Sequence, residues 1–317
     1  MINFRYHVVS LAAVFLALAI GLVVGTAAAN GPLAENLNDQ VNKITDEKEQ
    51  LRDDLDQSRA ELKKNSDFAT EVAPMLLNGK LTGHTALLVK IEGNDKDVDT
   101  AADGITTMLQ TAGAKLTGTV TIKEKFTAAA SDNTLLDLAE STAPPAISGA
   151  LPNNGKGQEA SAALLAAVLV ADKAGTPQVD GTRKVLSAYQ SGGYIGLDGD
   201  LKTPADVVIV VAGAPATGKD AKERNAAALT VVSRLDVALS GDVVVAGLSA
   251  NGLVSSVRDD ASIAKDVSTV DNAVTAYGQV AAVMALVERL GGKTGHYGIG
   301  SGATSLLPKT ASAASGS

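Results

Sequence analysis

Hydrophobic positions along the chain follow three successive patterns. From Val8 to Ala29 the chain carries no charge and is mostly apolar. In residues 33–66, apolar residues recur at alternating spacings of four and three among charged residues. From residue 84 onwards, short apolar runs alternate with longer amphipathic segments. In order, the patterns predict a transmembrane helix at 8–29, a coiled coil at 33–66 and an α/β domain.

The uncharged segment 8–29 is long enough to cross a hydrocarbon core of about 30 Å as a helix. Arg5 precedes it, and no Lys or Arg follows until Lys43. Because basic residues favour the cytoplasmic side, we expect residues 1–7 in the cytoplasm and the bulk outside it, with the helix anchored in the plasma membrane. A cleaved signal peptide is the alternative, since three alanines at 27–29 are typical of a cleavage site. Both interpretations export the rest of the chain.

After a turn expected at Gly31 and Pro32, the composition becomes charged and helix-forming. Lys48 and Ser58 are polar interruptions in an otherwise apolar heptad seam. The apolar seam residues are Leu37, Val41, Ile44, Leu51, Leu55 and Leu62. The seam predicts a partner helix, from a second copy or from another protein. The alternative is a lone amphipathic helix folded back on the globular domain. In either case, residues 67–83 are expected to link this helix to the domain.

Residues 84–290 predict an α/β domain with a mostly parallel sheet flanked by helices. The continuous β-branched runs at 207–212 and 243–248 are typical of parallel strands that are buried on both faces. Further strands are expected at 84–91 and 115–122, and helices at 98–111, 132–140, 159–171, 221–238 and 276–290. Residues 291–317 are rich in Gly, Ala, Ser and Thr and predict a flexible tail.

The stretch GAPATGKD, residues 213–220, matches the phosphate-binding pattern G-x-x-x-x-G-K-[ST] except at Asp220. We favour a turn followed by a capping box, in which Asp220 and Glu223 open the next helix. Ligands of open α/β sheets bind beyond the carboxyl ends of the strands. The candidate residues in these sheet-edge loops are therefore Gly213, Gly218, Ser249 and Asn251, although loops with a purely structural role fit equally.

The composition disfavours several classes of function. The net charge of −8, with no basic block longer than Lys63–Lys64, disfavours nucleic-acid binding. The chain has no Cys, and its three His share no spacing, so no metal ligands or cofactor-binding residues are predicted. The motifs SDN (131–133), SxxK (262–265) and KTG (293–295) occur in the wrong order for a penicillin-binding enzyme, and we predict no catalytic residue.

Four stretches carry a family resemblance: INFRYHVVSLAAVFLALAIGLVVG (2–25), VSTVDN (267–272), GQVAAVMAL (278–286) and GGKTGHYG (291–298). They resemble the actinobacterial MctB family, called SteB in corynebacteria. The family-signature residues Ser268, Thr269, Asp271 and Asn272 receive no role from the resemblance. One interpretation is that Asp271 and Asn272 cap the helix that follows.

The resemblance implies two functions. One is copper transport, in an envelope or outer-membrane channel, which would make copper a ligand. The other is cell division, in which a SteA-like membrane partner cooperates and the stalk engages a peptidoglycan hydrolase in the cell wall. The heptad seam favours the second function, because it is a partner-binding device. We therefore expect a non-catalytic, membrane-anchored envelope protein, with copper homeostasis as the alternative.

Overall fold

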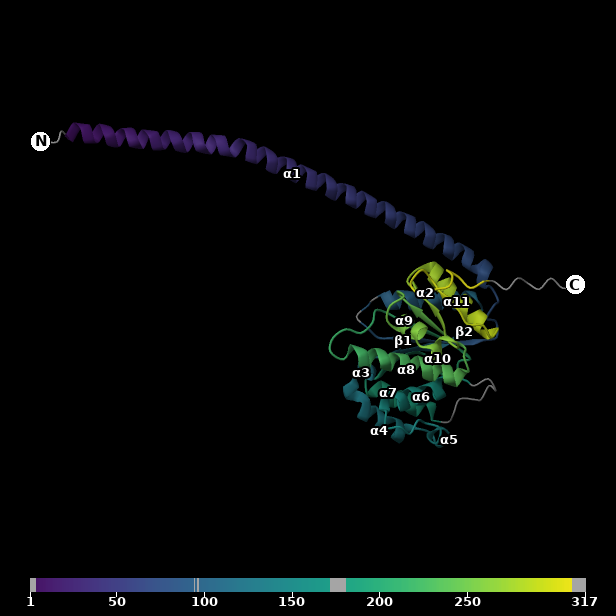
Figure 1. Cartoon of the computed structure of the whole chain (residues 1–317). Helices are drawn as coiled ribbons and strands as arrows, with labels where there is room; N and C mark the ends of the chain where they lie inside the picture. Colours follow the sequence, from purple (N-terminus) through teal and green to yellow (C-terminus); the bar gives the residue numbers. More distant parts are fainter. Residues whose placement is uncertain (1–3, 94, 96, 172–180, 310–317) are drawn as a thin grey trace. The chain divides into compact units, whose positions relative to one another are not determined.

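The computed structural model describes residues 4–93, 95, 97–171 and 181–309, and for residues 28–35 it describes the backbone alone. The chain divides into two compact units, Met1–Asn65 and Ser66–Ser317. One helix, α1 (Phe4–Leu77), contains both the apolar segment and the heptads (Figure 1). Its backbone stays helical through Gly31 and Pro32, so the turn expected there is absent. A proline removes only one N–H hydrogen bond, and the flanking helical turns supply the rest.

The expected linker at 67–83 is also largely helical, because α1 continues to Leu77. Ala73 and Leu77 are almost fully buried in the second unit, where they join the same apolar cluster as Leu81. Only residues 78–83 form the turn before the first strand. The last turns of α1 therefore belong to the core of the α/β unit.

A single seven-stranded sheet forms the centre of the second unit, in the order β3-β2-β1-β4-β5-β6-β7. Neighbouring strands are parallel except β2 and β3, which are antiparallel. This confirms the predicted mostly parallel α/β fold. The strands are β1 (Thr85–Ile91), β2 (Lys115–Ile122), β3 (Ile195–Gly199), β4 (Val207–Ala212), β5 (Val243–Gly247), β6 (Ser268–Val270) and β7 (His296–Tyr297).

Helices cover both faces of this sheet, as Figure 1 shows. One face packs against α2 (Asp97–Thr111) and α11 (Ala276–Leu290). The other face packs against α4 (Asp132–Thr142), α6 (Gly157–Leu169), α7 (Thr182–Ser191), α8 (Ala221–Leu239) and α9 (Leu253–Asp259). Short helices complete the unit: α3 (Glu124–Thr127), α5 (Pro145–Ser148), α10 (Ala261–Ala264) and a 3₁₀ turn at Ala129–Ser131. All six residues of β4 are buried, as its β-branched sequence predicts.

Residues 291–309 do not form the flexible tail expected from their composition. Tyr297 in β7 is buried, and β7 pairs with β6. Tyr297 also bridges to Ser305, whose carbonyl oxygen accepts a hydrogen bond from the Gly298 N–H. Backbone pairing and one buried ring hold this segment despite its small residues. Residues 310–317 lie outside the described part of the chain.

The strand order reverses direction between β1 and β4. The chain leaves β1 toward β2 on one side of the sheet and leaves β4 toward β5 on the other. The loops that follow β1 and β4 therefore diverge from adjacent strand ends. This topological switch point is where open α/β sheets form a crevice.

Candidate functional site

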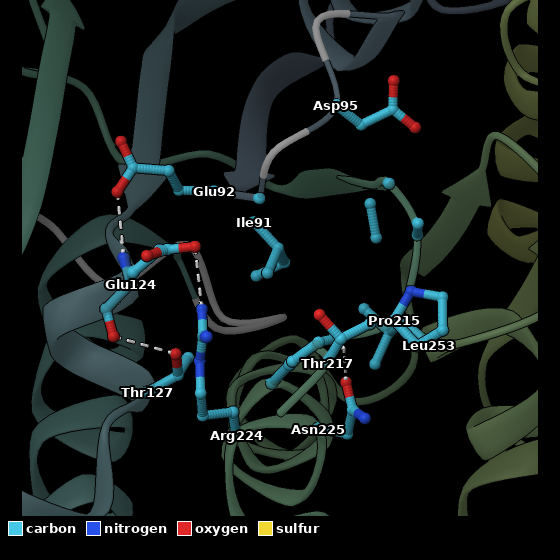
Figure 2. A pocket seen from close by; sticks show the side chains of 16 residues that line it. Ile91, Glu92, Asp95, Glu124, Thr127, Pro215, Thr217, Arg224, Asn225 and Leu253 are labelled. Carbon is cyan, nitrogen blue, oxygen red and sulfur yellow. Dashed lines mark hydrogen bonds and ion pairs between the residues drawn. The ribbon is translucent and has the colours of Figure 1, made fainter. Parts of the chain in front are cut away.

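A pocket of about 390 Å³ lies at this switch point (Figure 2). Five segments surround it: the end of β1 with its following loop, α3, the end of β4 with its following loop, the first turns of α8, and the start of α9. The residues that line it are Ile91, Glu92, Gly93, Asp95, Glu124, Thr127, Ala212, Gly213, Ala214, Pro215, Ala216, Thr217, Arg224, Asn225, Ala228 and Leu253.

Arg224 and Glu124 form an ion pair across one wall of the pocket. The Nη2 of Arg224, on α8, lies 2.9 Å from the Oε1 of Glu124, on α3. The backbone N–H of Glu124 donates to the Oε2 of Glu92 at 2.9 Å, which ties α3 to the end of β1 (Figure 2). The Nε of Arg224 is buried and has no hydrogen-bond partner among the described residues. One donor of the guanidinium is thus left unused beside the pocket.

The loop after β4 is held from both sides. The Oδ1 of Asn225 accepts a hydrogen bond from the Ala216 N–H at 2.9 Å. Gly252, with a φ of 72°, packs so closely on Pro215 that a Cβ would lie 3.1 Å from the proline nitrogen. The loops after β4 and β5 therefore meet, as expected for neighbouring parallel strands.

The four sheet-edge residues from the sequence occupy different places. Gly213 lines the pocket, whereas Gly218, Ser249 and Asn251 are not among the residues that line it. Gly218 has a φ of 100° and shapes the turn before α8. The Ser249 Oγ accepts from the Asn251 N–H at 3.3 Å, within a local turn after β5.

Acidic side chains outnumber basic ones in the pocket lining. Glu92, Asp95 and Glu124 contribute carboxylates, and Arg224 contributes a guanidinium that Glu124 already pairs. By charge alone, such a lining disfavours phosphate and favours a cationic ligand. Sequence reasoning missed Glu92, Glu124 and Arg224. Glu92 alone had a signal, since it follows a predicted strand at its carboxyl end.

The GAPATGKD stretch does not have the geometry of a phosphate loop. Helix α8 begins at Ala221, after the lysine, and Lys219 is exposed and outside the lining of the pocket. The expected capping box is also wrong. Asp220 has φ −102° and ψ 14°, not an extended cap conformation, and its side chain makes no capping hydrogen bond. The carboxylate therefore does not satisfy the first-turn N–H groups it was expected to cap.

The family-signature residues surround a buried ion pair. Asp271 is completely buried, and its Oδ2 lies 3.2 Å from the Nη2 of Arg258 on α9. The Oδ1 of Asp271 accepts from the Ile299 N–H at 2.8 Å. Arg258 also donates to the Thr269 Oγ1 at 2.8 Å and to the Tyr297 carbonyl oxygen at 2.8 Å. This cluster ties β6 and α9 to the segment that contains β7.

Capping by Asp271 and Asn272 is contradicted by these contacts. Thr275 is the N-cap of α11, and its Oγ1 accepts from the Gly278 N–H at 3.2 Å. Asn272 adopts a φ of 59°, and its carbonyl oxygen accepts from the Thr275 hydroxyl at 2.7 Å. Ser268 instead accepts the Gly295 N–H at 3.1 Å. Ser268, Thr269 and Asp271 thus hold the sheet edge, whereas Asn272 contacts the N-cap Thr275 through its carbonyl oxygen.

The first unit presents a second candidate site, the heptad seam. Its six apolar residues on α1 are exposed by 49–68%. The segment Phe4–Ala27 of the same helix contains an 18-residue window with a mean hydropathy of 2.7 and is long enough to cross a membrane. Its apolar composition indicates membrane anchoring.

The family model described as "Copper transport outer membrane protein, MctB" matches residues 1–308. The chain belongs to the MctB family. Curated relatives named "Copper transporter MctB" from Mycobacterium tuberculosis (strain ATCC 25618 / H37Rv) and Mycobacterium leprae (strain TN) are each 31% identical to it. Each match covers 96% of this chain and 99% of the relative. The MctB match thus spans α1 and the α/β unit together.

In this MctB family member, no three His, Asp or Glu side chains gather as a metal site within the described residues. His84 lies 2.8 Å from Asp206, and the Nδ1 of His296 lies 2.9 Å from the Thr269 Oγ1. Burial, followed by the charge of Arg258, lowers the pKa of His296. The copper transporters to which the chain is similar therefore point to no ligand residues among those described.

The serine and lysine of the SxxK stretch have separate partners. Ser262 donates its hydroxyl to Asp260, the N-cap of α10. Lys265 lies 3.7 Å from Asp266, at an exposed position. The MctB relatives carry the names of transporters, consistent with the expectation that the chain is not an enzyme.

Proposed function

We propose that this chain takes part in copper transport at the cell envelope, as a membrane-anchored and non-catalytic protein. The observation that carries the proposal is the match to relatives named copper transporters, which extends over 96% of this chain. Because the match includes α1 as well as the α/β unit, we assign the function to the anchored chain as a whole.

The apolar segment of α1 is proposed as an uncleaved anchor in the plasma membrane. Arg5 precedes the segment and Lys43 is the first basic residue after it, which favours a cytoplasmic start and an exported α/β unit. The family description names the outer membrane. Fractionation of the envelope separates these locations: recovery with the outer layer would overturn the plasma-membrane assignment.

We further propose that the heptad seam is where this protein assembles. Leu51 and Leu55 are 68% and 49% exposed, although both are large apolar side chains. Apolar residues at heptad spacing gain free energy when a partner helix removes them from water. The role in copper transport would then depend on what the stalk binds.

Copper content of whole cells tests the function. A strain that lacks this gene is complemented with the wild-type chain, with Leu51→Asp/Leu55→Asp, or with Gln50→Asp/Gln57→Asp. The last variant adds the same two charges on the outer face of α1 and serves as the matched control. We expect cell copper to change several-fold in the deletion strain, and the wild type and the control, but not the seam variant, to restore it. Unchanged copper on deletion would refute the copper role.

A second candidate is regulation of cell-wall hydrolysis during division, which the exposed seam also favours. In this case the stalk would bind a peptidoglycan hydrolase, with a SteA-like membrane protein as a further partner. Affinity capture from membranes, with the same two variants, tests it. Capture of a hydrolase that the seam variant loses, in cells with unchanged copper, would favour this candidate over copper transport.

A further inference from the structure

The charges beside the heptad seam follow a regular pattern. With Val41 and Leu55 at a positions and Ile44 and Leu51 at d positions, the g and e positions from residue 47 to residue 61 are acidic and basic respectively, whereas the preceding g and e positions are the uncharged Gln40 and Thr45. The g residues are Glu47, Asp54 and Glu61, and the e residues in the same stretch are Arg52 and Arg59. All five lie on the described part of α1 and are exposed. One flank of the seam is therefore negative and the other positive.

This pattern distinguishes the two orientations of a pair of identical helices. In a parallel, in-register pair, each g residue faces the e residue five positions later in the other copy. Glu47 then meets Arg52 of the other copy, and Asp54 meets Arg59. In an antiparallel pair, g faces g and e faces e, which would set acid against acid and base against base. The charges favour the parallel orientation and oppose the antiparallel one.

The polar seam positions support a defined register. Lys48 occupies an a position between Ile44 and Leu51. A single polar a residue costs stability, but it penalises registers that place it against a different layer. Within the helix, Arg59 lies 3.5 Å from Asp56, and both side chains are largely exposed. Such a surface contact is weak, so Arg59 stays available to a second helix.

We propose that residues 37–62 of α1 pair with the same residues of a second copy as a parallel, in-register, two-stranded coiled coil. The inference rests on the assembly role given to the seam under the proposed function, and it replaces an undefined partner by a second copy. It does not depend on copper. A shared anchor at the start of α1 would hold both helices parallel in one membrane.

Disulfide cross-linking in membranes tests the pairing with the full-length chain. The protein has no Cys, so a single introduced cysteine reports one position without further changes. Two cysteines at the d position of a parallel pair come within the roughly 6 Å Cα separation that a disulfide spans. Leu51→Cys should therefore give a cross-linked dimer under mild oxidation. Asp53→Cys, two residues away on the outer face, is the matched control and should remain monomeric.

Charge reversal tests the assignment of e and g. In the Leu51→Cys background, Glu47→Lys/Asp54→Lys makes both flanks basic, and Arg52→Glu/Arg59→Glu makes both acidic. Each variant alone should lose most of the cross-linked dimer, by about fivefold or more. Co-expression of the two, with different tags, should restore cross-linking between unlike chains, because every facing pair is again opposite in charge.

Three results would overturn the proposal. One is a Leu51→Cys cross-link to a protein of different mass instead of to itself. Another is a cross-link between Ile44→Cys and Leu55→Cys copies, which face each other only in the antiparallel arrangement. The third is cross-linking that charge reversal leaves unchanged. Ile44→Cys alone, at a second d position, guards against a local defect at Leu51.

The cross-linking experiment and the copper measurement can refute the dimer and the copper function independently of each other. If the chain cross-links as a dimer but cell copper is normal in the deletion strain, the copper function is refuted and the dimer stands. If the seam variant reproduces the copper phenotype of the deletion strain but the chain does not cross-link to itself, the copper function stands and the seam binds another protein.

Discussion

The guanidinium of Arg258 and the carboxylate of Asp271 form an ion pair at 3.2 Å in which the two side chains are 5% and 0% exposed. Around it, the Ile299 N–H and the Asn272 side-chain amide donate to Asp271. The pair is therefore fully hydrogen-bonded as well as charged, which is the condition under which a buried ion pair is tolerated. It joins α9, β6 and the segment after β7 into one packed edge.

Removal of one partner should destabilise the α/β unit strongly. Arg258→Met leaves the Asp271 charge buried without a counter-charge, and we expect a loss of about 3–5 kcal/mol in the free energy of unfolding. Urea unfolding of the detergent-solubilised full-length chain, followed by far-UV circular dichroism, measures it.

The exposed pair between Lys202 and Asp200 provides the control. Its atoms are 2.7 Å apart, yet both side chains are more than 60% exposed. Lys202→Ala should therefore cost less than about 1 kcal/mol. Equal losses in the two variants would contradict the structural role given to Arg258 and Asp271.

Hydrophobic pattern predicted the central strands because their environment is uniform. β4 and β5 are covered by helices on both faces, so every residue is apolar and the runs are unbroken. β3 is an antiparallel edge strand of sequence IGLDG, whose polar and glycine residues carry no such pattern. β6 is only three residues long, and its Ser268 and Thr269 are buried through hydrogen bonds that sequence periodicity does not report.

Strand ends predicted one edge of the pocket, but not the pairing of its charges. Gly213 follows a strand that the sequence identifies, and the carboxyl end of that strand lies at the switch point. Glu124 and Arg224 meet only because α3 packs on α8. Asp271 was expected to cap a helix because it precedes one in the sequence, and its actual partner, Arg258, lies on α9, which the hydrophobic pattern did not predict. Ion pairs between residues that are distant in the sequence can be predicted only once the fold is known.

Gly157 should tolerate no side chain. It begins α6 where that helix lies against the backbone of α4, and a Cβ would overlap the carbonyl oxygen of Asp132. Because backbone cannot move aside as a side chain can, Gly157→Ala should cost about 1–3 kcal/mol or more in unfolding free energy. Gly149→Ala is the matched control, since nothing lies within 4 Å of its Cβ position. Thermal unfolding that ranks the two variants in the reverse order would contradict the close approach of α4 and α6.

Completion of the phosphate-loop pattern should not create a nucleotide site. Asp220→Ser gives the sequence G-x-x-x-x-G-K-S, but α8 still begins after the lysine, and the nearby pocket stays acidic. We expect no binding of Mg-ATP by either wild type or variant in isothermal titration calorimetry up to roughly 1 mM, a range set by ordinary substrate affinities. Saturable binding by the variant, abolished by a further Lys219→Ala, would show that the loop can adopt a phosphate-binding geometry.

Asp236 on α8 should make stability depend on pH. Burial and, to a smaller extent, the nearby charge of Asp266 raise the pKa of its carboxyl to about 6, although Arg289 opposes the shift. In the unfolded chain the pKa of an aspartate is about 3.9, so the folded protein binds the proton more tightly. The stabilising contribution of this group is complete below about pH 4 and is lost as the pH rises through about 6.

Asp236→Asn replaces the carboxyl with a group that stays neutral. The variant should match wild type near pH 4 and exceed it at pH 7.5 by about 1 kcal/mol, because Asp236 is only half-buried and water screens its charge. Urea midpoints at both pH values measure the difference. Asp198→Asn, at an exposed position, reports the effect of simply removing one negative charge. If the advantage of Asp236→Asn over that control is the same at both pH values, then Asp236 does not titrate between them, and burial has not raised its pKa.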